Sequence, residues 1–187
     1  MKNTTIKFGS LFLGLGLMLI SLTGFSQDVK LTKQEQKEVR KAKNNYDFLV
    51  LDSMLQSKSF VLEADYLENQ YGYRRPVLSN LNFIMVDSSN VVLQTGSNRI
   101  SGSNGVGGAT AEGNVKDLNI VKNPKNHSFW LRFTVVTNIG VYDVDMTIYS
   151  NKLAKATITG LTPGRLVYDG RIQPLYDSRV YRGRNSI

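Results

Sequence analysis

From residue 60 to residue 172, apolar and polar side chains alternate along the chain in short runs. Leu131, Phe133 and Val135, for example, alternate with Arg132 and Thr134. A period of two is typical of β-strands that bury one face. The pattern predicts about eight strands, at residues 60–67, 81–86, 91–95, 114–121, 129–136, 141–149, 153–159 and 165–172.

Most connections between these strands are short and rich in turn-forming residues, such as residues 87–90 (DSSN) and 123–126 (NPKN). Strands joined in this way pair antiparallel, because a parallel crossover needs about a dozen residues or more. A large antiparallel sheet curls and tends to close on itself. The expected fold is α+β and mostly β: an N-terminal helix followed by an antiparallel meander of about eight strands, curled into a barrel or half-barrel.

The helix is expected at about residues 32–57, and it begins with a capping box, Thr32-x-x-Glu35. Behind the capping box, apolar residues recur at helical spacing and form one stripe: Val39, Ala42, Tyr46, Leu49, Val50 and Met54. The remaining surface carries a basic row that includes Lys33, Lys37 and Lys41. We expect the apolar stripe to cover the open face of the curled sheet and the basic row to face solvent.

The register of the central hairpin follows from its apolar faces. With the turn at Asn138-Ile139, both apolar sets lie on one side only if Phe133 is opposite Val144 and Leu131 is opposite Met146. The other face then pairs Arg132 with Asp145 and Thr134 with Asp143. The next hairpin turns over residues 150–152, and it adds Ala154, Ala156 and Ile158 to the apolar side and Lys155 and Thr157 to the polar side.

The first 26 residues have the three-part pattern of a secretory signal peptide. Lys2 and Lys7 precede an apolar run at residues 11–20, and Gly24 and Ser26 are small residues placed for a cut before Gln27. The apolar stretch at residues 8–22 is shorter than the roughly 20 residues that span a bilayer. We therefore expect a signal peptide at residues 1–26, a single domain at residues 27–187 without a transmembrane anchor, and a periplasmic or secreted location.

The composition is that of a folded domain without disulfide bonds. The 187-residue chain is 41% hydrophobic and 20% charged, and it contains no cysteine. The roughly 160 residues after the signal can bury enough surface to form a core. Loss of Lys2 and Lys7 takes the formal charge from +8 to +6, because no acidic residue precedes Gln27. An exported basic domain meets envelope components rather than nucleic acid, so we expect no nucleic-acid partner.

Residues 102–108 (GSNGVGG) invite comparison with phosphate-binding loops. A P-loop requires Lys and Ser or Thr directly after the glycines, at the start of a helix. Here residues 109–112 (ATAE) follow, and the next segment has a strand pattern. A dinucleotide fingerprint requires a parallel sheet, which is not expected here. The run therefore indicates a tight loop, or a movable rim over a ligand opening.

The charged candidates have structural explanations. His127 is the single histidine, so a zinc site or a Ser-His-Asp triad lacks partners at the required spacing. Asp143 and Asp145 could form an acid/base pair or a calcium site, but the register offers Asp145 an arginine across the sheet. We predict no catalytic residue, no metal site and no cofactor.

Several short motifs together resemble one known family, the bacterial domain-of-unknown-function family 4251. They are residues 58–65 (KSFVLEAD), 81–86 (LNFIMV), 104–108 (NGVGG) and 142–144 (YDV), with Gly113, Gly160, Tyr168, Gly170 and Tyr181. The resemblance covers nearly all of the chain after residue 26. It implies an exported protein of about this length, and it implies no activity and no functional residue.

Two classes of function remain open. In the first, the domain is a non-enzymatic binding module for an apolar or amphipathic ligand or an envelope partner. Ala154 and Ala156 would leave room inside the sheet, and Gly105, Gly107 and Gly108 would form a movable rim. In the second, the domain is a hydrolase acting on cell-envelope material through carboxylates that the sequence does not identify. The missing nucleophile motifs favour binding over catalysis.

We predict that export removes residues 1–26. The intact mass of the exported protein should correspond to a chain that begins at Gln27, with or without cyclisation of that glutamine. An exported species that retains residues 11–20 would contradict this prediction.

Overall fold

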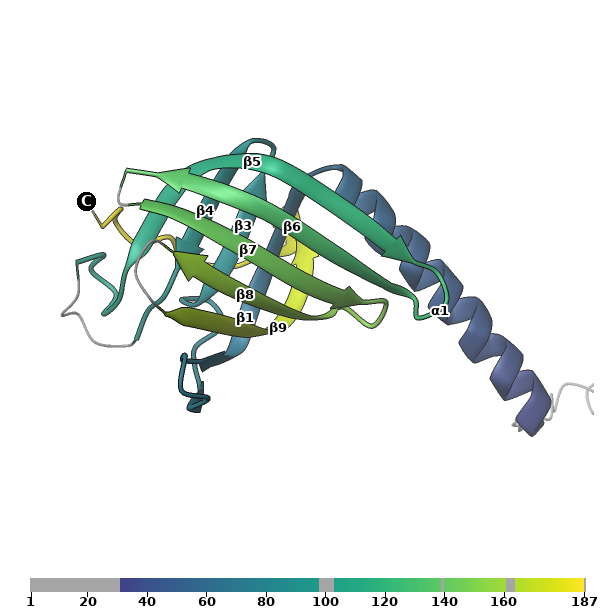
Figure 1. The fold of residues 1–187 in the computed structure, drawn as a ribbon. Helices are drawn as coiled ribbons and strands as arrows, with labels where there is room; N and C mark the ends of the chain where they lie inside the picture. The colour runs from purple at the N-terminus through teal and green to yellow at the C-terminus, as the bar shows by residue number, and fades with distance from the viewer. Residues whose placement is uncertain (1–30, 98–102, 139, 161–163, 187) are drawn as a thin grey trace, which may run out of the picture. The chain divides into compact units, whose positions relative to one another are not determined.

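The computed structural model describes residues 31–97, 103–138, 140–160 and 164–186 (Figure 1). The predicted signal peptide, Gly102 and Ile139 lie outside these residues. The regular elements are α1 (Lys33–Gln56), β1 (Ser59–Glu68), β2 (Arg74–Pro76), β3 (Phe83–Asp87), β4 (Asn90–Gln94), β5 (Thr110–Asn123), β6 (Ser128–Thr137), β7 (Gly140–Tyr149), β8 (Leu153–Gly160), β9 (Arg165–Pro174) and the short 3-10 helix η1 (Leu175–Asp177). None of the helices in these ranges is long and apolar enough to cross a membrane.

The chain consists of two compact units, with the boundary after Gln36. In the first unit, the structure describes residues 31–36. The predicted capping box is confirmed here. The Thr32 N–H donates to Glu35 Oε2 (2.7 Å), and the Glu35 N–H donates to Thr32 Oγ1 (3.3 Å). The backbone N–H of Thr32 above all, together with the Thr32 side chain, stabilises the charged carboxylate and holds the pKa of Glu35 below its usual range.

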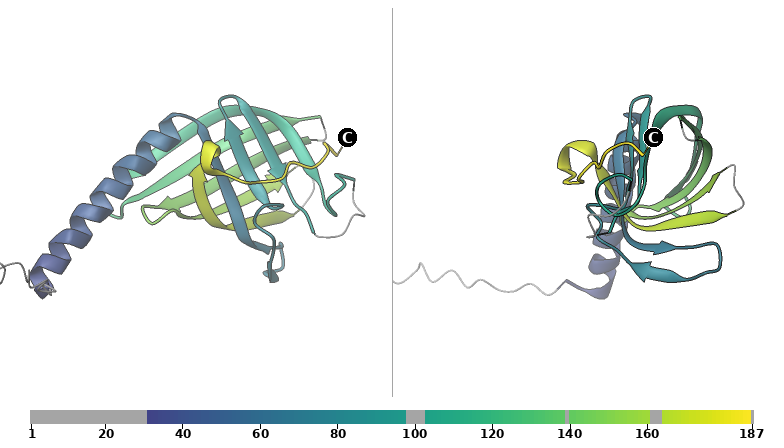
Figure 2. Two further views of the ribbon diagram at one scale, coloured as in Figure 1. Left: turned by 180° about the vertical axis from the view of Figure 1, so that it is seen from behind. Right: turned by 90° about the vertical axis from the view of Figure 1, so that its left-hand side faces the viewer.

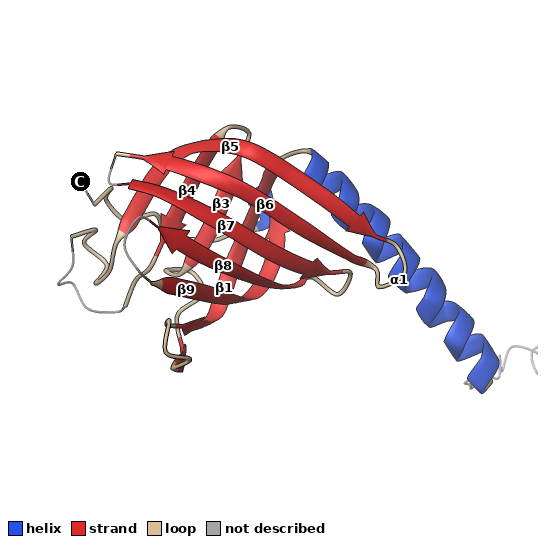
Figure 3. Ribbon diagram, viewed as in Figure 1, coloured by secondary structure: helices blue, strands red, loops and turns tan. Residues whose placement is uncertain are grey.

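In the second unit, all strands form one antiparallel sheet that closes into a barrel (Figures 1 and 3). The strand order is β2-β1-β3-β4-β5-β6-β7-β8-β9, and β9 also pairs with β1. The barrel therefore contains every strand except β2, which pairs only with the second half of β1. The predicted fold is confirmed, and the sheet is a closed barrel rather than a half-barrel. The sequence pattern did not indicate the three-residue strand β2.

The predicted register is confirmed in both central hairpins. Phe133 lies opposite Val144, and Leu131 lies opposite Met146. On the outer face, Arg132 Nε is 3.8 Å from Asp145 Oδ1, and Thr134 Oγ1 donates to Asp143 Oδ1 at 2.7 Å. Ala154, Ala156 and Ile158 are buried on the inner side of β8.

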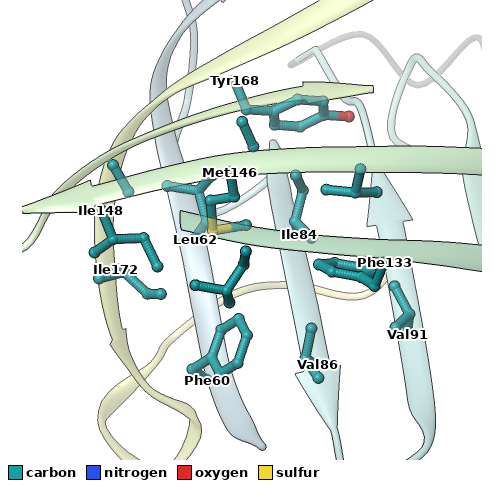
Figure 4. Close-up of a cluster of buried hydrophobic side chains, with 14 of the residues drawn as sticks. Phe60, Leu62, Ile84, Val86, Val91, Phe133, Met146, Ile148, Tyr168 and Ile172 are labelled. Carbon is teal, nitrogen blue, oxygen red and sulfur yellow. The ribbon is translucent and has the colours of Figure 1, made fainter. Parts of the chain in front are cut away.

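Large apolar side chains fill the interior between the ends of the barrel (Figure 4). Phe60, Leu62, Phe133, Met146 and Ile172 are each at most 1% exposed. In Figure 4, Phe60 and Val86 lie at one end of this cluster and Tyr168 lies at the other. The barrel is thus a packed core through its middle, and any space for a ligand must lie at an end.

Helix α1 packs through a different face from the one that the sequence analysis predicted. The buried and half-buried side chains are Phe48, Leu51, Met54 and Leu55. The expected stripe is largely exposed: Val39 is 54% exposed, Tyr46 68% and Leu49 65%. The reason is the closure of the sheet. Because the barrel buries its own inner face, only the end of the barrel is left for the helix to cover.

The docked part of α1 contacts the β5–β6 hairpin. The Phe48 ring stacks on Phe129 with 4.6 Å between centroids, and it meets the His127 ring edge to face with 5.7 Å between centroids. Lys122 Nζ lies 2.6 Å from Asp52, and His127 Nε2 lies 2.8 Å from Asn45 Oδ1. His127 therefore helps to hold the helix against the barrel.

The C-terminal segment, residues 175–186, crosses the outer face of β3 and β4 (Figure 2). Leu175 and Val180 cover a small outer core of Val61, Phe83 and Val92. Beside it, the buried Gln94 amide makes four hydrogen bonds. Its Nε2 donates to the Leu81 and Tyr181 carbonyls (3.1 and 2.8 Å), and its Oε1 accepts from Thr110 Oγ1 and Gly183 N (3.0 and 2.8 Å). One side chain thus holds together the C-terminal segment, the turn that leads into β3, and β5.

We predict that Phe133→Ala and Arg132→Ala differ strongly in their effect on the free energy of unfolding. Phe133 is 1% exposed, so its truncation should cost about 3–5 kcal/mol. Arg132 makes an exposed ion pair, so its truncation should cost only about 0.2–1 kcal/mol. Chemical denaturation of both variants measures the difference. Equal costs would contradict the inward orientation of Phe133.

We also predict that Gln94→Met lowers the free energy of unfolding by about 2–4 kcal/mol. The substitution preserves the side-chain volume but removes the amide, so the buried donors and acceptors around it lose their partners. The amide proton of Gly183 should exchange faster than in the unmodified protein. The matched control is Gln56→Met on the exposed surface of α1, which should change stability by less than about 0.5 kcal/mol. Slow exchange at Gly183 in Gln94→Met would show that another contact holds the segment.

Candidate functional site

The two ends of the barrel differ in what covers them. At one end, Leu51 and Leu55 of α1 join the barrel core. At the opposite end, β1, β4 and β8 finish and β5 and β9 begin. A cavity of about 480 Å³ lies at this second end, and we call it the mouth cavity. It is the candidate functional site.

The wall of the mouth cavity is apolar and aromatic. Leu93, Ala111, Ile158 and Tyr168 are buried, and Tyr142 and Leu166 are half-buried. The polar side chains lie toward the rim: Asn69, Gln70, Tyr71, Thr95 and Arg165. The site therefore combines an apolar interior with a polar opening, which is the usual arrangement of a small-molecule site.

Tyr168 forms part of the inner wall, and its hydroxyl is satisfied within the protein. The side chain is 1% exposed, and its hydroxyl donates to the Gln94 carbonyl at 3.0 Å. Burial raises the pKa of Tyr168 well above its ordinary value. Because the hydroxyl donates its proton to a backbone carbonyl and the side chain is buried, Tyr168 forms part of the cavity wall.

Small residues on the strand ends shape the opening. Gly160 lies opposite Tyr142 in the β7–β8 pairing, and a Cβ at Gly160 would come within 3.1 Å of the Tyr142 ring. The missing side chain lets the ring lie against the backbone of β8. An aromatic ring beside glycine is a known stabilising arrangement at the edges of sheets. The ring thereby becomes part of the cavity wall.

Positive charge slightly exceeds negative charge next to the rim. Arg165 lies 3.5 Å from Glu68, which Lys155 also approaches at 3.9 Å. Arg74 pairs with Asp169 at 2.8 Å and lies over the Tyr66 ring at 3.9 Å. These ion pairs are all partly exposed. Among the described residues that line the cavity, Arg165 is the one with a charged side chain.

The five residues that the sequence analysis singled out for ligand binding lie elsewhere in the described structure. Ala154 and Ala156 are buried in the barrel core, where Met146 and Tyr168 flank Ala156 on the neighbouring strands. Gly105, Gly107 and Gly108 belong to a loop that Asn104 ties together. The Asn104 side chain accepts from the Val106 and Gly108 N–H groups (3.1 and 3.0 Å).

Glycine at position 108 has a local structural reason. A Cβ there would lie 2.2 Å from the Thr95 carbonyl oxygen, so a side chain at this position would collide with backbone. The next residue, Ala109, lines the mouth cavity together with Thr95. The glycine-rich loop is therefore adjacent to the cavity, although its glycines are not part of the described lining.

The charged candidates remain apart. His127 lies at the helix end of the barrel, and Asp143 and Asp145 lie on the outer face of β7 with Thr134 and Arg132 as partners. Within residues 31–97, 103–138, 140–160 and 164–186, no three His, Cys, Asp or Glu residues come together in a way that could hold a metal ion. The mouth cavity went unrecognised in the sequence because its described residues come from five strands and from three connections between strands. The one signal was that Tyr142, Gly160 and Tyr168, which all line it, carry part of the family resemblance.

Comparison with known proteins supports the resemblance seen in the sequence. The family model described as "Domain of unknown function (DUF4251)" matches residues 24–172. No curated protein matches the chain. Among solved structures, the chain is similar to a DUF4251 family protein from Bacteroides eggerthii, with 25% sequence identity, a TM-score of 0.59, and coverage of 71% of this chain and 91% of that chain. Because the family model covers most of the sequence, the chain belongs to the DUF4251 family.

Proposed function

We propose that the domain is a binding module whose mouth cavity holds the apolar part of an amphipathic small molecule. The observation that carries the proposal is the pairing of a largely apolar wall with a polar rim at the end of the barrel that α1 does not cover. The volume of about 480 Å³ falls within the range typical of small-molecule sites, roughly 300–1,000 Å³.

The packed interior limits how far a ligand can enter. Beyond Tyr168, the barrel is filled by residues such as Met146 and Phe133, which are at most 1% exposed. A ligand therefore inserts one short apolar group, while the rest of the molecule remains at the rim. There, Arg165 and the amides of Asn69 and Gln70 can hydrogen-bond a polar or anionic group.

Binding fits the described lining better than hydrolysis of envelope material. The described lining contains no Asp, Glu or His. A hydrolase built on a carboxylate pair requires two such groups facing one another across the substrate. The first 26 residues have the pattern of a signal peptide, so we propose that the ligand is encountered in the periplasm or outside the cell.

The experiment is a titration of residues 27–187 with an environment-sensitive fluorescent fatty acid. We expect saturable binding, and we expect Leu166→Trp to weaken it by at least about tenfold, because indole fills the mouth cavity. The control is Val136→Trp, which adds the same side chain on the exposed outer face of β6 and should leave binding unchanged.

Native mass spectrometry of protein purified from its own cells gives an independent measurement. We expect a co-purifying small molecule in the unmodified protein and its loss in Leu166→Trp. Absence of both saturable probe binding and a co-purifying molecule would overturn the proposal. Equal loss of binding in Leu166→Trp and Val136→Trp would show that the probe binds outside the mouth cavity.

A further inference from the structure

Helix α1 has an apolar face that nothing in the described structure covers. Val39, Tyr46, Leu49 and Val50 are between 42% and 68% exposed, and they lie on the side of the helix opposite to Phe48, Leu51 and Leu55. Every residue from 37 to 46 is exposed. An exposed apolar stripe of this kind on a soluble domain marks an interaction surface.

The spacing of this stripe is that of a coiled-coil seam. Val39, Ala42, Tyr46, Leu49 and Ser53 follow one another at intervals of three, four, three and four residues. A seam of this spacing faces a partner helix along its length when the helices pair side by side. In heptad notation, Val39 and Tyr46 occupy a positions, and Ala42 and Leu49 occupy d positions.

The charges beside the seam select a second copy of this chain in the parallel orientation. Glu38 occupies a g position, and Lys43 occupies the e position of the following heptad. In a parallel pair, these two positions face each other across the seam, so Glu38 of each copy meets Lys43 of the other. In the single chain, Lys43 Nζ contacts Asp47 Oδ2 at 2.6 Å, and it remains exposed enough to accept a second carboxylate.

An anionic membrane is a poorer occupant for the same face. Lys37 and Lys41 lie on the opposite side of the helix from the stripe, and its two borders carry one lysine, Lys43, and one carboxylate, Glu38. A helix that binds such a membrane places basic residues along both borders of its apolar face and no carboxylate beside it. The charge pattern therefore favours a partner helix over a lipid surface.

We infer that α1 is a self-association helix, which pairs in parallel with α1 of a second copy along Val39, Ala42, Tyr46 and Leu49. The seam spans about two heptads, so the dimer is weak, as is typical of interfaces below roughly 1,200 Å². The seam lies on α1, whereas the mouth cavity lies at the end of the barrel that α1 does not cover, so the dimer leaves the cavity accessible. This inference stands independently of the proposed ligand.

The test is sedimentation velocity of residues 27–187 over a wide concentration series. We expect a monomer–dimer equilibrium that Tyr46→Lys abolishes, because it places two ammonium groups in the seam. Glu38→Lys and Lys43→Glu should each weaken the dimer by roughly tenfold, because each replaces two attractive contacts with two repulsive ones. The double variant should recover association to within about threefold of the unmodified protein.

The matched control is Lys41→Glu, which makes the same charge change as Lys43→Glu on the far side of the helix and should leave the dimer unchanged. Circular dichroism of each variant separates loss of pairing from loss of helix. A monomer at every concentration would overturn the inference, whether or not the protein binds anionic vesicles. Failure of the double variant to recover association, with helix content retained, would overturn the parallel register.

Discussion

The sheet closes where β9 hydrogen-bonds to β1, and most other features of the structure depend on this strand pairing. Residues 60–68 of β1 pair with residues 167–174 of β9, with a register shift between Ala64 and Tyr66. At the shift, Gly170 lies so close to β1 that a Cβ would be 2.0 Å from the Glu63 carbonyl oxygen. A bulge in one strand and a glycine in its partner therefore let the two strands meet at the angle that closure requires.

Closure determines where the remaining parts of the chain can act. A closed barrel has no edge strands to protect and no inner face to cover, so only its two ends and its outside remain. The last turns of α1 cover one end with Leu51 and Leu55. The opposite end keeps the mouth cavity, and the C-terminal segment covers part of the outside. The two proposed roles, ligand binding at one end of the barrel and self-association through α1, follow from this arrangement.

A small set of buried polar groups connects the mouth to the rest of the molecule. Gln94, Thr110 and Asn104 are at most 1% exposed and hydrogen-bond one another or the segments around them. Through Gly183 and Tyr181, the same network holds the C-terminal segment against the barrel. Because each polar atom of the Gln94 side chain has its partners, the network specifies one arrangement of these segments rather than merely adding stability.

Local pattern was enough to determine much of the fold from the sequence. Alternation in residues 129–159 predicted the register of Phe133 with Val144 and of Arg132 with Asp145, because a shift by one residue would expose the whole apolar set. The capping box at Thr32 and Glu35 was equally local. Tertiary structure alone decided the closure of the barrel, the docked face of α1 and the mouth cavity. Helix α1 carries two apolar stripes, and only the position of the β5–β6 hairpin decides that Phe48 packs on Phe129 while Tyr46 stays exposed. The cavity is assembled from strand ends that are distant in sequence and become neighbours only when β9 meets β1.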